Sequence, residues 1–92
     1  METYCVASFP SVSHALRFEK LMNSLQEPVT LIPVPRIISS SCGIAARFPL
    51  DRLEKVTRLI ASGQAEVENI YHFSSNHRSL SAVSCPGPWD AQ

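Results

Sequence analysis

The order in which extended and helical patterns follow one another is the feature that most restricts the fold of this chain. Residues 3–9 alternate across a pleat in the way a half-buried strand does. Residues 12–26 then place apolar side chains at helical spacing, and Ser11 before them is a suitable N-cap. These two segments predict a strand followed by a helix.

Prolines restrict the next segment. Residues 28–35, PVTLIPVP, are short and rich in branched side chains, and Pro33 and Pro35 interrupt them. Because proline has no backbone N–H to donate to a central ladder, a strand containing it belongs at a sheet edge. We therefore expect an edge strand here.

Three further segments complete the regular part: an extended segment at 43–48, a helical segment at 49–63 and an extended segment at 65–73. The order is thus strand, helix, strand, strand, helix, strand, and both βαβ units have to be right-handed. This order predicts an α+β, ferredoxin-like βαββαβ sandwich with a four-stranded antiparallel sheet and two helices on one face. In that topology the second strand lies at an edge, which agrees with its prolines.

The C-terminal residues lose this regularity. Residues 74–92 are rich in serine and proline and show no periodicity. We expect a folded domain at 1–73 and a flexible or loosely docked tail at 74–92, which Trp89 could pin to the domain.

Composition restricts the functional class. The 92 residues fit one domain, and the charges balance at eight basic and eight acidic, so no basic surface for nucleic acid is expected. No apolar run approaches the roughly 18 residues that span a bilayer, and the N-terminus does not look like a signal peptide. We expect a cytoplasmic protein that binds neither membrane nor nucleic acid. Its three cysteines are widely spaced and should be free thiols.

Cys42 is the strongest candidate for chemistry because it lies in a polar loop that leaves an edge strand. A reactive cysteine needs its thiolate, which cations, amides and hydroxyl donors favour. The loop supplies these groups in Arg36, Ser39, Ser40, Ser41 and Gly43. The same composition is also typical of a turn around a small, half-buried and unreactive cysteine. The residues alone leave both interpretations open.

The remaining candidates are weaker. Cys5 lies within the first strand and is expected to be core packing, whereas Cys85 is either an exposed thiol or a resolving thiol for Cys42. Glu19 is either an exposed carboxylate or a buried partner for Arg36. No CxxC or HxxxH pair is present, so we expect no metal site and no cofactor.

Two segments resemble a known family. They are ASFPSVSHALRFEKLM, residues 7–22, and VTLIPVPRIISSSCGIAARF, residues 29–48. Together they resemble the family of selenium/sulfur carrier protein-like domains, and the likeness covers Tyr4 to Tyr71. Its most specific part is a PxPR segment followed by Ser-x-Cys-Gly, formed here by Pro33, Pro35, Arg36, Ser40, Cys42 and Gly43.

The resemblance implies a carrier without turnover of its own. Cys42 would hold a sulfane sulfur or selenium as a persulfide or perselenide, and donor and acceptor proteins would load and unload it. Arg36 and the serine loop would hold the charged adduct. Two alternatives stay open. One is a non-covalent anion- or protein-binding module with a structural Cys42, which a homodimer would suit, and the other is a thiol-transfer enzyme that uses Cys42 with Cys85.

Overall fold

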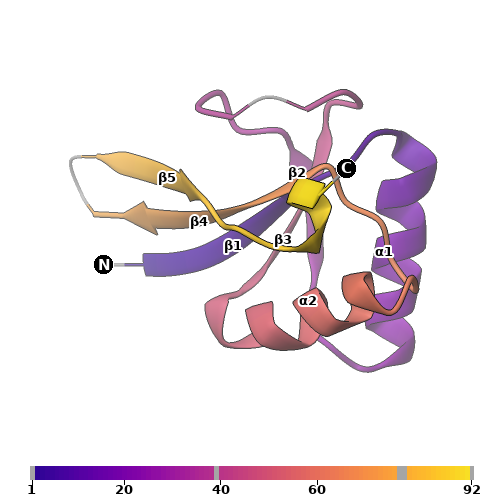
Figure 1. Cartoon of the computed structure of the whole chain (residues 1–92). Helices are drawn as coiled ribbons and strands as arrows, with labels where there is room; N and C mark the ends of the chain where they lie inside the picture. The colour runs from indigo at the N-terminus through magenta and orange to yellow at the C-terminus, as the bar shows by residue number, and fades with distance from the viewer. Residues whose placement is uncertain (1, 39, 77–78, 92) are drawn as a thin grey trace.

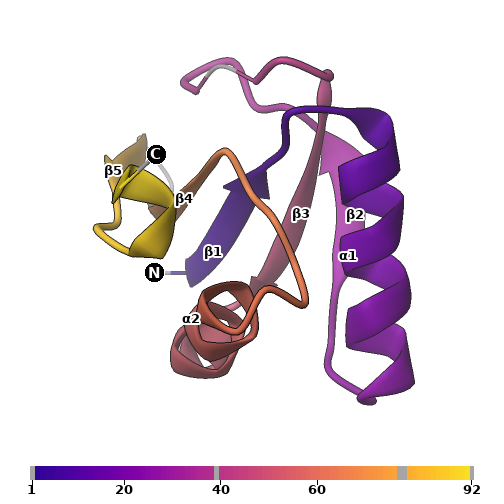
Figure 2. The same ribbon diagram turned by 45° about the vertical axis from the view of Figure 1, so that its right-hand side comes forward.

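The computed structural model describes residues 2–38, 40–76 and 79–91. The chain forms an α+β fold in which a five-stranded antiparallel sheet, ordered β2-β3-β1-β4-β5, carries two α-helices on one face (Figures 1 and 2). The elements are β1 (Glu2–Ser8), α1 (Val12–Ser24), β2 (Thr30–Pro33), β3 (Ile44–Pro49), η1 (Leu50–Arg52), α2 (Leu53–Ala61), β4 (Asn69–Ser75), β5 (Leu80–Ser84) and η2 (Pro88–Ala91).

The expected α+β class, the two helices and the antiparallel sheet are confirmed, but the expected four-stranded ferredoxin-like sheet is wrong in its strand number. The fifth strand, β5, pairs with β4 from Tyr71 opposite Ser84 to Ser75 opposite Leu80. A short hairpin connects β4 to β5. In it, the Asn76 amide donates to the Ser79 carbonyl oxygen at 3.0 Å. The segment 74–92, expected as a tail, thus contributes a strand to the sheet.

The edge position of β2 is confirmed, and the hydrogen bonds explain how the strand tolerates a proline. The Val34 amide donates to the Gly43 carbonyl oxygen at 3.1 Å, so even-numbered residues of this strand bond to β3. Pro33 is odd-numbered, and its nitrogen therefore points away from the sheet. A missing N–H at that position breaks no ladder bond.

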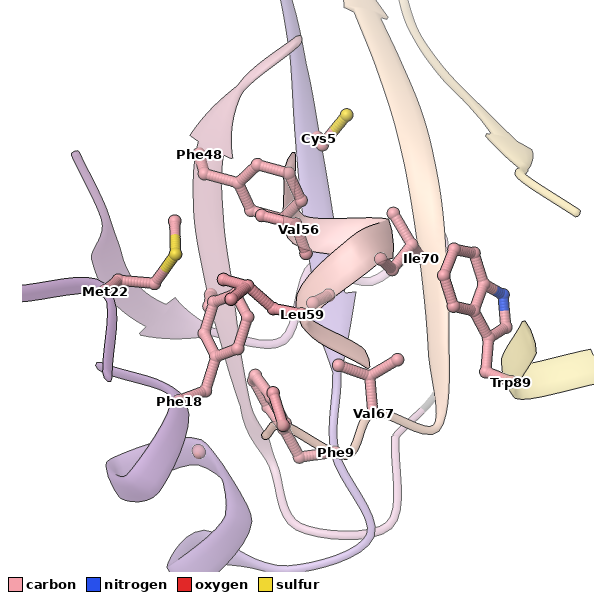
Figure 3. Close-up of a cluster of buried hydrophobic side chains, with 14 residues drawn as sticks. Cys5, Phe9, Phe18, Met22, Phe48, Val56, Leu59, Val67, Ile70 and Trp89 are labelled. Carbon is pink, nitrogen blue, oxygen red and sulfur yellow. The ribbon is translucent and has the colours of Figure 1, made fainter. Parts of the chain in front are cut away.

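The main core lies between the sheet and the helices (Figure 3). Phe9, Phe18 and Phe48 form a chain of tilted rings with centroids 5.4 and 6.1 Å apart. Trp89 extends the core beside Ile70 and is only 5% exposed, so the C-terminal residues pack onto the body. The buried members of this cluster are Cys5, Ala7, Phe9, Ala15, Phe18, Met22, Ala46, Phe48, Val56, Leu59, Ala65, Val67, Ile70 and Trp89.

The last predicted strand begins later than expected, at Asn69 instead of residue 65. Ala65 and Val67 alternate with exposed glutamates as in a strand. They lie, however, in the connection between α2 and β4, where their side chains are buried in the main core. The preceding helix, α2, ends at Ala61, two residues before the expected stop at Gly63, whose φ of 84° lies in the left-handed region that favours glycine.

Three connections meet at one end of the sheet. Glu68, in the connection between α2 and β4, donates its amide to the Ser8 carbonyl oxygen at 2.7 Å. Ser40, in the loop between β2 and β3, donates its hydroxyl to the Phe9 carbonyl oxygen at 3.3 Å. The loop 34–43 therefore lies against the end of β1 and the start of α1, at the top of Figure 1.

Candidate functional site

Cys42 is half-buried in the loop that joins β2 to β3. Its thiol donates to the carbonyl oxygen of Ile44 at 3.2 Å, and its sulfur lies 3.9 Å from the Ser40 hydroxyl oxygen. The side chain also packs against the main core. The thiol is thus partly accessible and has two polar neighbours.

Ser40 fixes the position of Cys42 relative to the sheet. Its hydroxyl oxygen accepts the Cys42 amide at 3.4 Å while the hydroxyl donates to Phe9. Because one side chain bonds both groups, the backbone of the loop is attached directly to the end of β1. Ser40 thus lies beside Cys42, and its expected role as a binding residue stays a prediction.

Glu68 is a residue of the site that no pattern in the sequence indicates. Its carboxylate accepts the Ser41 amide at 3.4 Å and the Ser41 hydroxyl at 2.5 Å. These contacts join residues 27 positions apart, so no spacing rule could have linked them. A carboxyl group from the connection before β4 is therefore bonded to the residue that precedes Cys42.

Arg36 is placed differently from Ser40 and Ser41. Its side chain is exposed, and it makes no ion pair with any residue in the described part of the chain. Glu19, the alternative partner considered for it, is half-buried and is not paired with it. Gly43 has a φ of 77°, so glycine suits the turn that follows Cys42. Ser39 lies outside the described residues.

The other two thiols lie in less accessible or less favourable surroundings. Cys5 is fully buried, and burial raises its pKa to about 12, with the charge of Cys85 adding to the rise. Burial also raises the pKa of Cys85, although a hydrogen bond from the His72 backbone opposes the rise. Neither group favours a thiolate at neutral pH.

Metal binding finds no support in the geometry. Within residues 2–38, 40–76 and 79–91, no three histidine, cysteine or acidic side chains converge as metal ligands. His14 instead contacts the Ser11 hydroxyl through Nδ1 at 2.6 Å and Glu66 through Nε2 at 3.0 Å. His77 lies outside the described residues.

An apolar hollow opens beside the Cys42 loop at the β2 edge. Its volume is about 360 Å³, and its lining residues are Leu31, Ile32, Pro33, Gly43 and Ile44. Gly43 and Ile44 directly follow Cys42 in the chain, although the Cys42 side chain is not part of the lining and packs against the main core.

Comparison with known proteins adds a family. Residues 4–72 match the model of the family described as "Putative Se/S carrier protein-like", which is well over half of the chain. This match agrees with the resemblance identified from residues 4–71. No curated protein and no solved structure matches the chain. Across the described residues, no helix has both the length and the apolar character needed to cross a bilayer.

Proposed function

Because the chain belongs to the Se/S carrier protein-like family, we propose that it carries a sulfane sulfur or selenium atom on Cys42 and delivers it to a partner protein. One observation carries the choice of residue. Cys42 is the partly accessible thiol inside the matched region, since Cys5 is fully buried and Cys85 lies beyond residue 72. The protein acts as a covalent carrier that other proteins load and unload.

Loading is a thiolate exchange that needs no external oxidant. The Cys42 thiolate attacks the terminal sulfur of a donor persulfide, R–S–SH, so that a new S–S bond forms and the donor S–S bond breaks. The donor leaves as R–S⁻ with the bonding electron pair, and Cys42 becomes Cys42–S–SH. A donor R–S–SeH gives Cys42–S–SeH by the same exchange. Delivery repeats the step with an acceptor thiolate as the nucleophile.

The hydrogen bond from the Cys42 thiol to the Ile44 carbonyl oxygen holds the protonated side chain in place, and this bond is lost when the thiol ionises. A protonated thiol donates to the Ile44 carbonyl oxygen at 3.2 Å, but a thiolate has no proton to donate and is repelled by the same oxygen. Ionisation would thus turn the sulfur away from Ile44. The Ser40 hydroxyl, 3.9 Å away, would have to turn from the Phe9 carbonyl oxygen to donate to the thiolate.

Arg36 and the loop between Ser39 and Gly43 supply a positive charge and hydrogen-bond donors that stabilise the persulfide or perselenide anion. A persulfide or perselenide ionises more readily than a thiol, so its anion benefits from nearby donors. The exposed Arg36 guanidinium has no ion-pair partner among the described residues and is free to fold over the loaded sulfur. The apolar hollow at Gly43 would receive an apolar side chain of the donor or acceptor.

A second candidate is a non-covalent anion- or protein-binding module in which Cys42 is structural. The packing of Cys42 against the core and its bond to Ile44 favour this reading. It predicts binding at the loop without any covalent adduct.

Intact-mass measurement separates the two. The protein is incubated with a low-molecular-weight persulfide or selenopersulfide, and its mass is recorded before and after treatment with a reductant. We expect a reversible gain of one sulfur or selenium atom that Cys85→Ala retains and Cys42→Ala loses. Arg36→Ala should lower adduct yield, whereas Arg17→Ala, a matched exposed arginine on α1, should not. Absence of any adduct on the unmodified chain would refute the carrier.

A further inference from the structure

The two edges of the sheet differ in how they are protected. The β2 edge has only four residues and contains Pro33, and proline is a device that keeps sheet edges from pairing with other chains. The β5 edge, LSAVS, contains neither proline nor a charged residue. Leu80 is 42% exposed on it and Val83 is 64% exposed. The β5 edge therefore lacks the protection that β2 has.

The backbone of β5 also presents unused hydrogen-bonding groups. The Cys85 amide donates to the Ile70 carbonyl oxygen at 2.8 Å, so odd-numbered residues of this strand bond to β4. The N–H and C=O groups of Leu80, Ala82 and Ser84 consequently point outward. β5 is the last strand of the sheet, and no strand of the described chain lies beyond it (Figure 2).

We propose that the β5 edge pairs with the β5 edge of a second copy of this chain. The two strands run antiparallel about a two-fold axis at Ala82, and they join the two sheets into one. Each of the three outward-facing residues then donates one backbone hydrogen bond and accepts one, which gives about six bonds across the axis.

The sequence of β5 fits itself in this register. Ala82, the smallest side chain of the strand, lies on the axis, while Leu80 faces the partner's Ser84 and Val83 faces the partner's Ser81. A large side chain is thus always opposite a small one, and no like charges meet. About a two-fold axis each contact occurs twice, so this one sequence provides both sides of every pair, and a second copy fits the edge without any further partner.

The size of the edge sets the strength of the dimer. Strands of five residues bury less than the roughly 1,200 Å² typical of stable complexes, so the dimer should form weakly and depend on concentration. Cys42 directly precedes β3, which lies three strand spacings of about 4.8 Å, or about 14 Å, from β5. Dimerisation therefore leaves both Cys42 thiols outside the interface, and the inference does not depend on the carrier function.

Amide hydrogen exchange at low and high protein concentration tests the edge directly. We expect the amides of Leu80, Ala82 and Ser84 to become protected as concentration rises, in step with a dimer in sedimentation equilibrium. Leu31, whose amide points outward from the unpaired β2 edge, is the internal control and should not change. A protein that stays monomeric up to about 1 mM, where even a Kd of about 1 mM would leave half of the chains paired, would overturn the inference. So would a dimer without protection in β5.

Two double variants test the register. Leu80→Lys with Ser84→Lys places like charges opposite each other across the axis, whereas Leu80→Glu with Ser84→Lys places opposite charges there. Both add charged residues at the same two positions, so the variants differ only in the sign of the charge at residue 80. We expect the first to weaken the dimer about tenfold or more relative to the second, from two cross-strand pairs. Equal dimerisation of the two variants would show that the register is wrong.

Discussion

Glu68 holds Ser41 at two points, through the amide at 3.4 Å and the hydroxyl at 2.5 Å. The amide of Glu68 itself donates to the Ser8 carbonyl oxygen at 2.7 Å. One residue thus connects the end of β1 to the position next to Cys42. The order of the Cys42 loop depends on a side chain from the other half of the chain.

Replacing Glu68 should loosen this loop. We expect Glu68→Ala to lower the free energy of unfolding by about 1 kcal/mol, the net value of such hydrogen bonds at an exposed site. The amides of Ser41 and Cys42 should exchange faster with solvent, and Glu68→Gln, which keeps an acceptor oxygen, should show a smaller change. Glu54→Ala, which removes an exposed i,i+4 pair with Arg58, is the control and should leave the loop amides unchanged. Unchanged exchange in Glu68→Ala would show that the loop is held by other contacts.

The three thiols should react in a fixed order in the folded protein. Iodoacetamide should modify Cys42 first and Cys85 more slowly, because burial raises the pKa of Cys85. Cys5 should react only when the protein unfolds, since it is fully buried and its pKa is about 12. Peptide mass spectrometry after timed labelling measures the three rates, and labelling in denaturant, where the rates should converge, is the control. Early modification of Cys5 would contradict the burial described here.

The helices and strands whose apolar residues recur at a regular spacing could be predicted from the sequence, whereas β5, which lacks such a spacing, could not. Helix α1 and strand β1 each follow a clear pattern, and the structure has both close to the expected bounds. In β5 the residues LSAVS alternate only weakly, because both faces carry small or polar side chains. Its place in the sheet depends on pairing with β4, which a pattern within the strand does not reveal.

In the candidate site, neighbours that are close in the sequence could be predicted, whereas contacts between distant parts of the chain could not. Ser40 and Gly43 lie within two residues of Cys42, so their closeness to it follows from chain connectivity. The contacts to Phe9 and Glu68 join residues 31 and 27 positions apart and depend on the tertiary fold. Loop composition also could not fix the direction of the long Arg36 side chain, which the structure leaves exposed.

The stability of the protein should fall in alkaline solution because of Cys5. Its thiol has a pKa of 9.0 when unperturbed and about 12 in the fold, so between these values the unfolded chain loses a proton that the folded chain keeps. The unfolded state then binds fewer protons, and the free energy of unfolding decreases by up to about 1.4 kcal/mol per pH unit above pH ~9. Urea denaturation from pH 8 to 11 should show a shallower slope for Cys5→Ala than for the unmodified chain. Ser13→Ala, which changes an exposed side chain that does not titrate, is the control, and its slope should match that of the unmodified chain.

The ion pairs of Glu27 should contribute stability that disappears in acid. A hydrogen bond from Lys55 is the main cause that lowers the pKa of Glu27 below 4.5, and the charges of Lys55 and Arg52 add to it. The carboxylate therefore stabilises the fold above pH 4.5, and this contribution is lost as pH falls through the lowered pKa. Glu27→Gln should be less stable than the unmodified chain at pH 7, and the two should converge in acid. Glu54→Gln should show little difference at either pH, and a Glu27→Gln deficit that persists in acid would contradict this assignment.

Trp89 should hold the C-terminal residues against the main core. Its indole packs beside Ile70, and its Nε1 donates to the Cys85 carbonyl oxygen at 3.1 Å (Figure 3). Trp89→Ala should cost about 3–5 kcal/mol of unfolding free energy, whereas Trp89→Phe keeps an aromatic ring and should lose less.

Gly87 provides an independent test of the same packing, because a Cβ at this position would clash with the Trp89 ring. Gly87→Ala should displace the indole and shift the emission of this single tryptophan to longer wavelength. Gly63→Ala, where a Cβ meets open space but φ is 84°, is the control: it should lower stability through backbone strain while the folded-state emission stays unchanged. If Gly87→Ala leaves the emission unchanged, the indole does not pack over Gly87.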